Sequence, residues 1–278
     1  MADIASPYQE IAAPKPARAG FHNKALYPWL SWLMPVVILC VWETASRLGW
    51  IAPQVMPAPS RVAETAWELA RTGELFVHLG ASLLRAAGGF VLGGTIGFAL
   101  ALAVGFSPLA HALLDRSIQM IRAIPFLALL PLVIVWFGVD ESGKIFLVSL
   151  AVLFPVYINT VLGIRQIDPK LLELAKITGM PWFAVVRRII IPGAMPSVLT
   201  GVRYALAHAW LALVVAETLA TTRGIGFLAM DAREFLQTDV ILLSIIIYAT
   251  IGVGADSLAR LLETRWLGWH PNFAKGAR

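Results

Sequence analysis

The sequence has little charge and almost no cysteine. Only 14% of its 278 residues are charged and 58% are hydrophobic, and the mean hydropathy is +0.75. A soluble domain carries about 25% charged residues, so this composition predicts a membrane protein. The single cysteine, Cys40, lies in an apolar run, which excludes a disulfide framework or a cysteine-rich metal cluster.

Signatures of enzyme active sites are also missing from the sequence. It contains no H-E-x-x-H metal motif and no G-x-S-x-G nucleophile motif. Residues 138–144, GVDESGK, fit the G-x-x-x-x-G-K pattern of a phosphate-binding loop. However, Ile145 follows where that loop needs Ser or Thr to hold magnesium, and no strand is expected before it. We therefore expect no catalytic residue, no metal site and no nucleotide site in this chain.

Six long uncharged or nearly uncharged runs predict six transmembrane helices. A helix needs about 20 apolar residues to cross the bilayer core, and its backbone must be hydrogen-bonded internally in lipid. Pro125 and Pro131 in the third run, and Pro155 in the fourth, predict kinks. The six runs are 29–45, 86–110, 123–139, 145–164, 204–216 and 240–255.

The positive charges favour one orientation of these helices. Lysine and arginine are in excess in the segments that lie inside if both termini are cytoplasmic, as the positive-inside rule requires. The same rule accounts for the net charge of +5, so no nucleic-acid partner is expected. The first 28 residues lack a signal peptide and are expected to be a disordered cytoplasmic tail.

The second run carries small residues at every fourth position. Such spacing lets two helix backbones approach closely. The partner of this face is either another helix of the same chain or a helix of a second subunit. The glycines of the pattern are Gly89, Gly93, Gly97 and Gly105.

Three arginines are candidates for guiding an anion: Arg85, Arg203 and Arg223. Ionisable groups at membrane depth suggest function by default. Arg85 and Arg203 each lie about one turn inside a predicted span, so snorkelling to the headgroups is the alternative. Glu217 lies near a span end, and His208 within a span is more typical of a bond between helices.

The loop between the fourth and fifth runs has more structure than a short connection needs. Asp168 followed by Pro169 predicts a helix start, and Gly179 predicts a left-handed stop. Pro181 then restarts a second helix, and Pro192 and Pro196 punctuate its entry into the next span. This predicts a helix, a glycine turn and a helix at the cytoplasmic face. It is either an amphipathic segment on the membrane surface or a docking surface for a soluble partner.

The same loop resembles the E-A-A-x-x-x-G-x9-I-x-L-P loop of binding-protein-dependent ABC importer permeases. Leu174 and Ile191 depart from the pattern, and both are apolar. The stretches FPVYINT, GIGFLAMDAREFLQTDV and LLETRWLGWHP resemble the subgroup that imports aliphatic sulfonates, taurine and nitrate, and most of all its aliphatic sulfonate permeases. The matching residues of the loop are Glu173, Ala175, Gly179, Ile189 and Pro192.

The resemblance implies an all-α polytopic protein with the type I ABC importer permease fold, in the bacterial inner membrane. The loop residues would contact an ATPase. The implied partners are two ABC ATPase subunits, an extracytoplasmic solute-binding protein, and a second permease subunit that is expected to be the same chain. This chain would bind no cofactor, since ATP and magnesium belong to the ATPase. The implied divisions are a tail at 1–28, a first helix and outer segment at 29–77, a permease core at 78–263 with the coupling loop 168–192, and a tail at 264–278.

Other functions remain open on the sequence alone. The solute could be taurine, nitrate or another small molecule rather than a sulfonate. An ion-coupled secondary carrier would need inverted repeats and a mid-membrane carboxylate, and neither is evident. An intramembrane enzyme would need a paired nucleophile and base or a metal cluster. The permease pair could also be a heterodimer.

Overall fold

The computed structural model describes residues 27–218 and 221–269, and every regular element in this part of the chain is a helix. The predicted all-α fold is therefore confirmed. The longer helices are α1 (Tyr27–Arg47), α2 (Pro59–Thr72), α3 (Glu74–Phe106), α7 (Glu141–Arg165), α8 (Pro169–Ile177), α10 (Ile191–Glu217), α11 (Ile225–Glu234) and α12 (Thr238–Trp266). The shorter pieces are α4 (Pro108–Ala110), the π-helical turn η1 (His111–Asp115), α5 (Arg116–Arg122), the 3-10 turn η2 (Phe126–Leu129), α6 (Leu130–Phe137), α9 (Trp182–Val185) and the π-helical turn η3 (Val186–Ile190). The two predicted tails lie mostly outside the described residues, and α12 extends to Trp266, past the expected boundary at 263.

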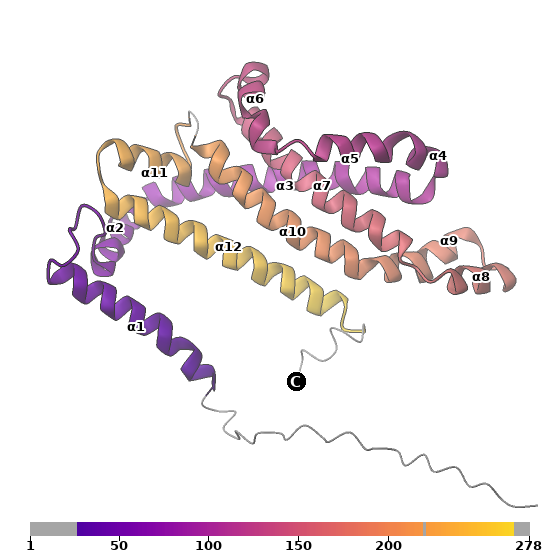
Figure 1. Ribbon diagram of the computed structural model, residues 1–278, viewed down its shortest axis with the longest axis horizontal. Coiled ribbons are helices and arrows are strands. Elements are labelled where there is room, and N and C mark those ends of the chain that lie inside the picture. Colours follow the sequence, from indigo (N-terminus) through magenta and orange to yellow (C-terminus); the bar gives the residue numbers. More distant parts are fainter. Residues whose placement is uncertain (1–26, 219–220, 270–278) are drawn as a thin grey trace, which may run out of the picture.

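The bundle is built around α7, which packs along α3 on one side and along α10 on another (Figure 1). α12 lies against α10 and α11. Most residues of the shared core are alanine or valine, which keep the helix axes close. Close packing of small residues holds helices together in lipid, where the hydrophobic effect between helices is weak. The buried core residues are Val148, Ala151, Val152, Val156, Ala205, Ala209, Ala212 and Leu213.

Four helical segments of the described chain are long and apolar enough to cross a membrane. They are Glu74–Phe106, Glu141–Arg165, Trp182–Glu217 and Thr238–Trp266. A fifth span results if the bent pair Pro108–Arg122 and Phe126–Phe137 is counted as one. The run at 29–45 forms α1, which is not among these spans. The count of six and the cytoplasmic position of the termini therefore stay predictions.

The third predicted span, 123–139, falls mainly on the second arm of the broken pair, Phe126–Phe137, and residues 123–125 are not helical. The chain bends by 83° between Arg122 and Phe126, and Figure 1 shows α6 turned away from α5. Pro125 lacks an N–H and disfavours helix at the residue before it, which explains a break where the sequence predicted only a kink. Residues 111–122, expected in an inner loop, belong to the first arm of this broken pair, Pro108–Arg122.

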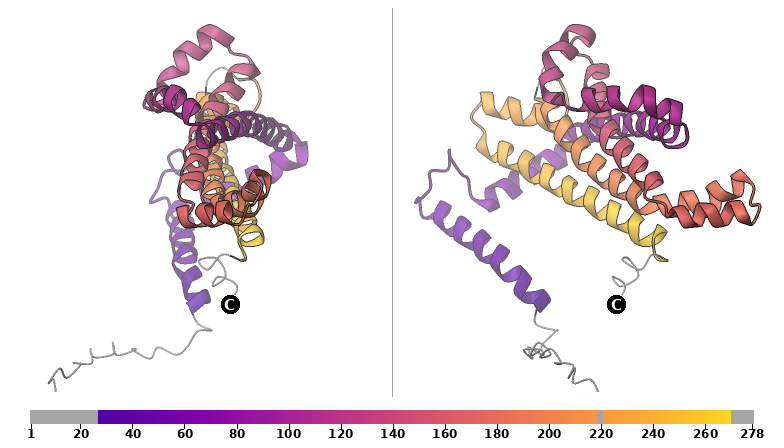
Figure 2. Two further views of the ribbon diagram at one scale, coloured as in Figure 1. Left: turned by 90° about the vertical axis from the view of Figure 1, so that its right-hand side faces the viewer. Right: turned by 45° about the vertical axis from the view of Figure 1, so that its right-hand side comes forward.

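α1 stands apart from the bundle in both views of Figure 2. Its contact with the rest of the chain is near its end, where Ser60 N and Oγ donate to Glu43 at 3.0 and 2.8 Å. Arg47 also donates to Ser60 Oγ at 3.1 Å. Large apolar side chains along the helix, such as Trp32 and Val41, are exposed. A surface of this kind faces lipid or a further subunit in a membrane.

Candidate functional site: a docking segment and a mid-membrane cavity

α8 begins and ends with strong local signals. Asp168 Oδ1 accepts a hydrogen bond from the backbone N–H of Lys170 at 2.9 Å, which caps the helix start. At the other end Gly179 has a φ of +68°, and the N–H of Met180 donates to the carbonyl of Ala175 at 2.9 Å. These features are those of a left-handed glycine stop. The predicted start at Asp168 and stop at Gly179 are confirmed.

The second helix of this segment joins the next span without a loop. The chain is helical without a loop from Trp182 to Glu217, over 36 residues. Pro192 sits in the first turn of α10, directly after the π-helical turn η3. A π turn widens the helix locally, and Pro192 itself lacks the N–H that an α-helical turn would use. Because no loop intervenes, a displacement of α9 passes directly into α10.

Four apolar side chains around the glycine turn point outward, and we call them the docking face: Leu174, Ile177, Trp182 and Phe183. Their exposed fractions run from 57% for Leu174 to 82% for Ile177. The turn lies at the end of the molecule away from α11 (Figure 1). An exposed apolar patch with a polar rim marks an interaction site. The exposed charged residues of this segment are Lys170, Glu173, Lys176, Arg187 and Arg188.

The five motif residues of this loop divide between surface and core. Glu173 and Gly179 are exposed, and Ala175 is only 3% exposed. Ile189 packs at the edge of the core beneath α8, and Pro192 is half-buried at the start of α10. Ala175 therefore seats α8 on the bundle, while the rest of α8 stays accessible. The buried residues of that core are Ile167, Ala175, Val185 and Ile190.

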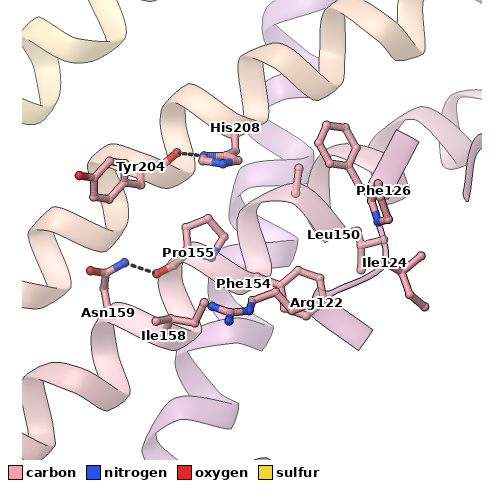
Figure 3. Close-up of a pocket in the computed structure, with 12 residues that line it drawn as sticks. Arg122, Ile124, Phe126, Leu150, Phe154, Pro155, Ile158, Asn159, Tyr204 and His208 are labelled. Atoms are coloured by element: carbon pink, nitrogen blue, oxygen red, sulfur yellow. Dashed lines mark hydrogen bonds between the residues drawn. The ribbon is translucent and has the colours of Figure 1, made fainter. Parts of the chain in front are cut away.

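A cavity of about 400 Å³ lies between α7, α10 and the break that follows α5 (Figure 3). Its walls are mostly apolar, with Arg122, Asn159, Tyr204 and His208 as the polar exceptions. The α7 and α10 residues that line it come from near the middle of these two helices. The cavity therefore lies near mid-membrane depth, midway between the ends of the bundle.

Backbone groups released by a proline also reach this cavity. Pro155 cannot donate to the carbonyl of Ala151, one turn earlier, and both residues line the cavity. Asn159 Nδ2 donates to the Pro155 carbonyl at 2.9 Å, and His208 Nδ1 pairs with the Tyr204 carbonyl at 2.7 Å. The bond of His208 stays within its own helix, rather than joining two helices as expected.

A buried ionic cluster lies at the opposite end of the bundle from α8. Arg85 and Glu217 are 5% and 1% exposed, and Arg85 Nη1 donates to Glu217 Oε1 at 2.7 Å. Arg85 also pairs with Glu141 through its Nε and Nη2 atoms. Ser82 Oγ contacts both Glu217 oxygens, at 2.7 and 2.9 Å. The cluster thus ties α3 to the start of α7 and the end of α10.

The loop before α11 closes over this cluster. Arg85 Nη1 donates to the carbonyl of Arg223 at 2.6 Å, and the N–H of Gly226 donates to Glu217 Oε2 at 3.0 Å. A Cβ on Gly224 would lie 2.6 Å from Arg85 Nη1, and the φ of Gly224 is +130°. Only glycine fits such a backbone at such a close approach.

The structure does not bring the three predicted arginines together. Arg85 is held by two carboxylates, Arg203 pairs with Asp256 at 2.7 Å, and the side chain of Arg223 is exposed. None of the three is among the described residues that line the cavity. Their role toward an anion stays a prediction. The arginine at the cavity is Arg122, which lies between the runs predicted as the second and third spans.

The glycine face of α3 lies against α7 of the same chain. A Cβ on Gly93 would collide with the backbone carbonyl of Ser149, and one on Gly97 would lie 2.5 Å from the carbonyl of Leu153. This is the packing of helices within one chain, one of the two alternatives for these residues. At the other two predicted glycines, Gly89 and Gly105, a Cβ would instead meet the side chains of Val148 and Ile164.

The near match to a phosphate-binding loop is part of a helix. Residues from Glu141 onward form the first turn of α7. Lys144 is 7% exposed, and its Nζ donates to Glu141 Oε1 at 3.1 Å. The side chain that would contact a phosphate therefore packs inside the bundle.

Comparison with known proteins decides the family. Residues 76–268 match the family described as "Binding-protein-dependent transport system inner membrane component". The chain belongs to this family. It is a multi-pass inner-membrane permease, and the ATPase of such a system is a separate subunit. The family implies ATPase and binding-protein partners.

This permease is similar to three curated relatives over most of its length. It is 51% identical over 242 residues to "Putative aliphatic sulfonates transport permease protein SsuC" of Escherichia coli (strain K12), covering 87% of this chain and 92% of the relative. It is 44% identical over 248 residues to the protein of the same name from Bacillus subtilis (strain 168), covering 89% and 90%. It is 36% identical over 239 residues to "Taurine transport system permease protein TauC" of Escherichia coli (strain K12), covering 84% and 87%.

Proposed function

We propose that this permease forms the translocation path of an ABC importer for aliphatic sulfonates. The choice of solute is supported by the higher identity to the two sulfonate relatives, 51% and 44%, than to the taurine relative, 36%. Taurine remains the second candidate on the same ground. Nitrate, the remaining solute of this subgroup, has no such support.

The observation that carries the transport mechanism is the docking face, which lies on α8 and α9. The second of these helices, α9, continues into the bundle as α10. Leu174, Ile177, Trp182 and Phe183 are exposed at one end of the molecule, where α8 fits the groove of an ATPase subunit. ATP and magnesium would bind the ATPase and not this chain. The full importer would contain two copies of this chain, two ATPases and one extracytoplasmic binding protein.

The continuous helix from α9 to α10 can transmit motion from the ATPase to the cavity that would hold the solute. Movement of the ATPases displaces α8 and α9, and α9 leads without a loop into α10. α10 carries Tyr204 and His208, which line the cavity. A rigid displacement of α10 would therefore change the shape of the cavity from a distance.

The proposed function is tested by reconstitution. The permease, its ATPase and its binding protein are placed in liposomes, and uptake of radiolabelled ethanesulfonate is measured with and without ATP. Uptake that requires ATP and is competed better by other sulfonates than by taurine is expected. Uptake that persists without ATP but collapses with an ion gradient would instead show a secondary carrier, and stronger competition by taurine would reassign the solute.

The glycine turn gives a sharper test of coupling. Gly179→Val is expected to abolish uptake and stimulation of the ATPase, because a β-branched residue is strongly disfavoured at a φ of +68°. Gly179→Asn is the matched control, since asparagine tolerates this conformation and no atom lies within 4 Å of a Cβ there. Both variants should insert in the membrane normally. Full uptake by the valine variant would contradict the assigned role of the turn.

A further inference from the structure

We propose that the cavity at the break after α5 is a binding station for the sulfonate inside the membrane, and that Arg122 contacts the anion. The inference rests on the proposed function and assigns it specific residues. The sulfonate head would lie at Arg122 and Asn159, and its alkyl tail would lie along the apolar wall. In Figure 3 the Arg122 side chain points toward the α7 segment that carries Ile158 and Asn159.

Arg122 is a charge without a counter-charge in an apolar setting. In residues 27–218 and 221–269 no carboxylate forms an ion pair with it, whereas Arg85 on α3 and Arg203 on α10 are both paired. Its cavity neighbours come from the middle of α7 and α10. Arg122 is exposed in the single chain, so its guanidinium is open to a ligand, and its planar fork suits an oxyanion.

The broken backbone supports a wet cavity at this point. Residues 123–125 are not helical, and such backbone at membrane depth is tolerated only where it is buried in protein or lines a water-filled space. Pro125 and Ile124 do line the cavity. Ala151, whose carbonyl is left without a helical donor by Pro155, is also among the lining residues.

The remaining walls match the other half of an aliphatic sulfonate. They are apolar and include two phenylalanines from different elements. An alkyl tail gains by leaving water for such a surface, whereas the ammonium group of taurine would be desolvated against it. Nitrate has no tail to use it. The larger apolar side chains that line it from α7 and η2 are those of Phe126, Leu150, Phe154 and Ile158.

Cysteine labelling tests whether the positive charge of Arg122 attracts anions into the cavity. Cys40 is the single cysteine, so Cys40→Ser gives a cysteine-free background in which Ile158→Cys places one thiol in the cavity. The thiol is reacted with sulfonatoethyl and trimethylammonioethyl methanethiosulfonate, which differ mainly in charge. The anionic reagent is expected to react faster, and Arg122→Gln should lower the ratio of the two rates by about tenfold. Arg122→Lys should retain most of it.

Added ligands identify what the cavity prefers. Propane-1-sulfonate should protect the introduced thiol, and inorganic phosphate should protect it less. The labelling is repeated in vesicles of phosphatidylcholine with and without phosphatidylglycerol. Slower labelling by the anionic reagent in phosphatidylglycerol would mean that a lipid headgroup occupies the site. That result, or a rate ratio unaffected by Arg122→Gln, would overturn the proposal.

Measurements of ethanesulfonate uptake then test the anion contact at Arg122 independently of the proposed importer function. In the reconstituted importer Arg122→Gln should lower ethanesulfonate uptake about tenfold or more, with copurification of the ATPase unchanged. Arg116→Gln is the matched control, because Arg116 is exposed on the same arm and does not line the cavity. Normal uptake by Arg122→Gln would refute the anion contact and leave the sulfonate importer intact. Absence of uptake by the wild type would refute the sulfonate function, and the labelling would still decide whether the cavity selects anions.

Discussion

At the residue scale, one guanidinium joins four parts of this permease. Arg85 on α3 is bonded to Glu141 on α7, Glu217 on α10 and the carbonyl of Arg223 before α11. A charge removed from water is tolerable only when it is paired and hydrogen-bonded, and these bonds supply the pairing. The cluster therefore fixes the end of the bundle that lies away from the docking face.

Neutralising the buried carboxylate of this cluster should destabilise the fold. Glu217→Gln leaves Arg85 with a single acidic partner, and breaking a buried pair costs about 3 kcal/mol or more. A lower midpoint of thermal unfolding in detergent is expected. Glu68→Gln is the control, because Glu68 is exposed and such changes stay within about 0.5 kcal/mol. Equal midpoints for the two variants would mean that the cluster does not hold the bundle.

At the element scale, the close contact between α3 and α7 depends on glycines of α3, which have no side chain to keep the two backbones apart. The glycines of α3 let its backbone reach the carbonyls of Ser149 and Leu153. The neighbouring Gly94 faces away from these carbonyls, and a Cβ there would meet only Val152 Cγ1 at 3.8 Å. Two adjacent glycines of one helix thus have different tolerance for the same methyl group.

This difference gives a paired prediction. Gly93→Ala should force α3 away from α7 and destabilise the protein by about 1–3 kcal/mol, the usual cost of overpacking. Gly94→Ala should be neutral or slightly stabilising, since alanine is the better helix former. Detergent stability and the fraction of monodisperse protein measure both. If Gly94→Ala proved as harmful as Gly93→Ala, the packing described for this face would be wrong.

At the scale of the whole molecule, the docking face and the ionic cluster lie at opposite ends, with the cavity between them. α7 and α10 run through all three regions. A displacement of α8 would therefore act on a bundle whose far end is fixed by the ionic cluster and whose middle contains the cavity. That arrangement suits a path whose central section changes shape while the end at the ionic cluster stays fixed.

The surface left for a second permease subunit is also decided at this scale. The glycine face is occupied by α7, so a dimer must use other exposed apolar side chains, such as Leu84, Val91 or Val135. We predict that two differently tagged copies of this chain copurify, and that Gly94→Ala leaves the pairing intact. Recovery of one tag alone would favour a heterodimer with a related chain.

The sequence by itself determined the membrane class, the all-helical fold, the family resemblance and the two ends of α8. These follow from composition or from signals that act within one helical turn, as at Asp168 and Gly179. The tertiary structure decided the rest. Arg85 and Glu217 are 132 positions apart, and only the packing of α3 against α10 brings them together. Arg122 precedes the run predicted as the third span, and the 83° break after it places it at the cavity. That break depends on how both arms pack against the bundle. A local signal can predict where a helix stops, but the neighbours that it meets depend on the packing of the whole chain.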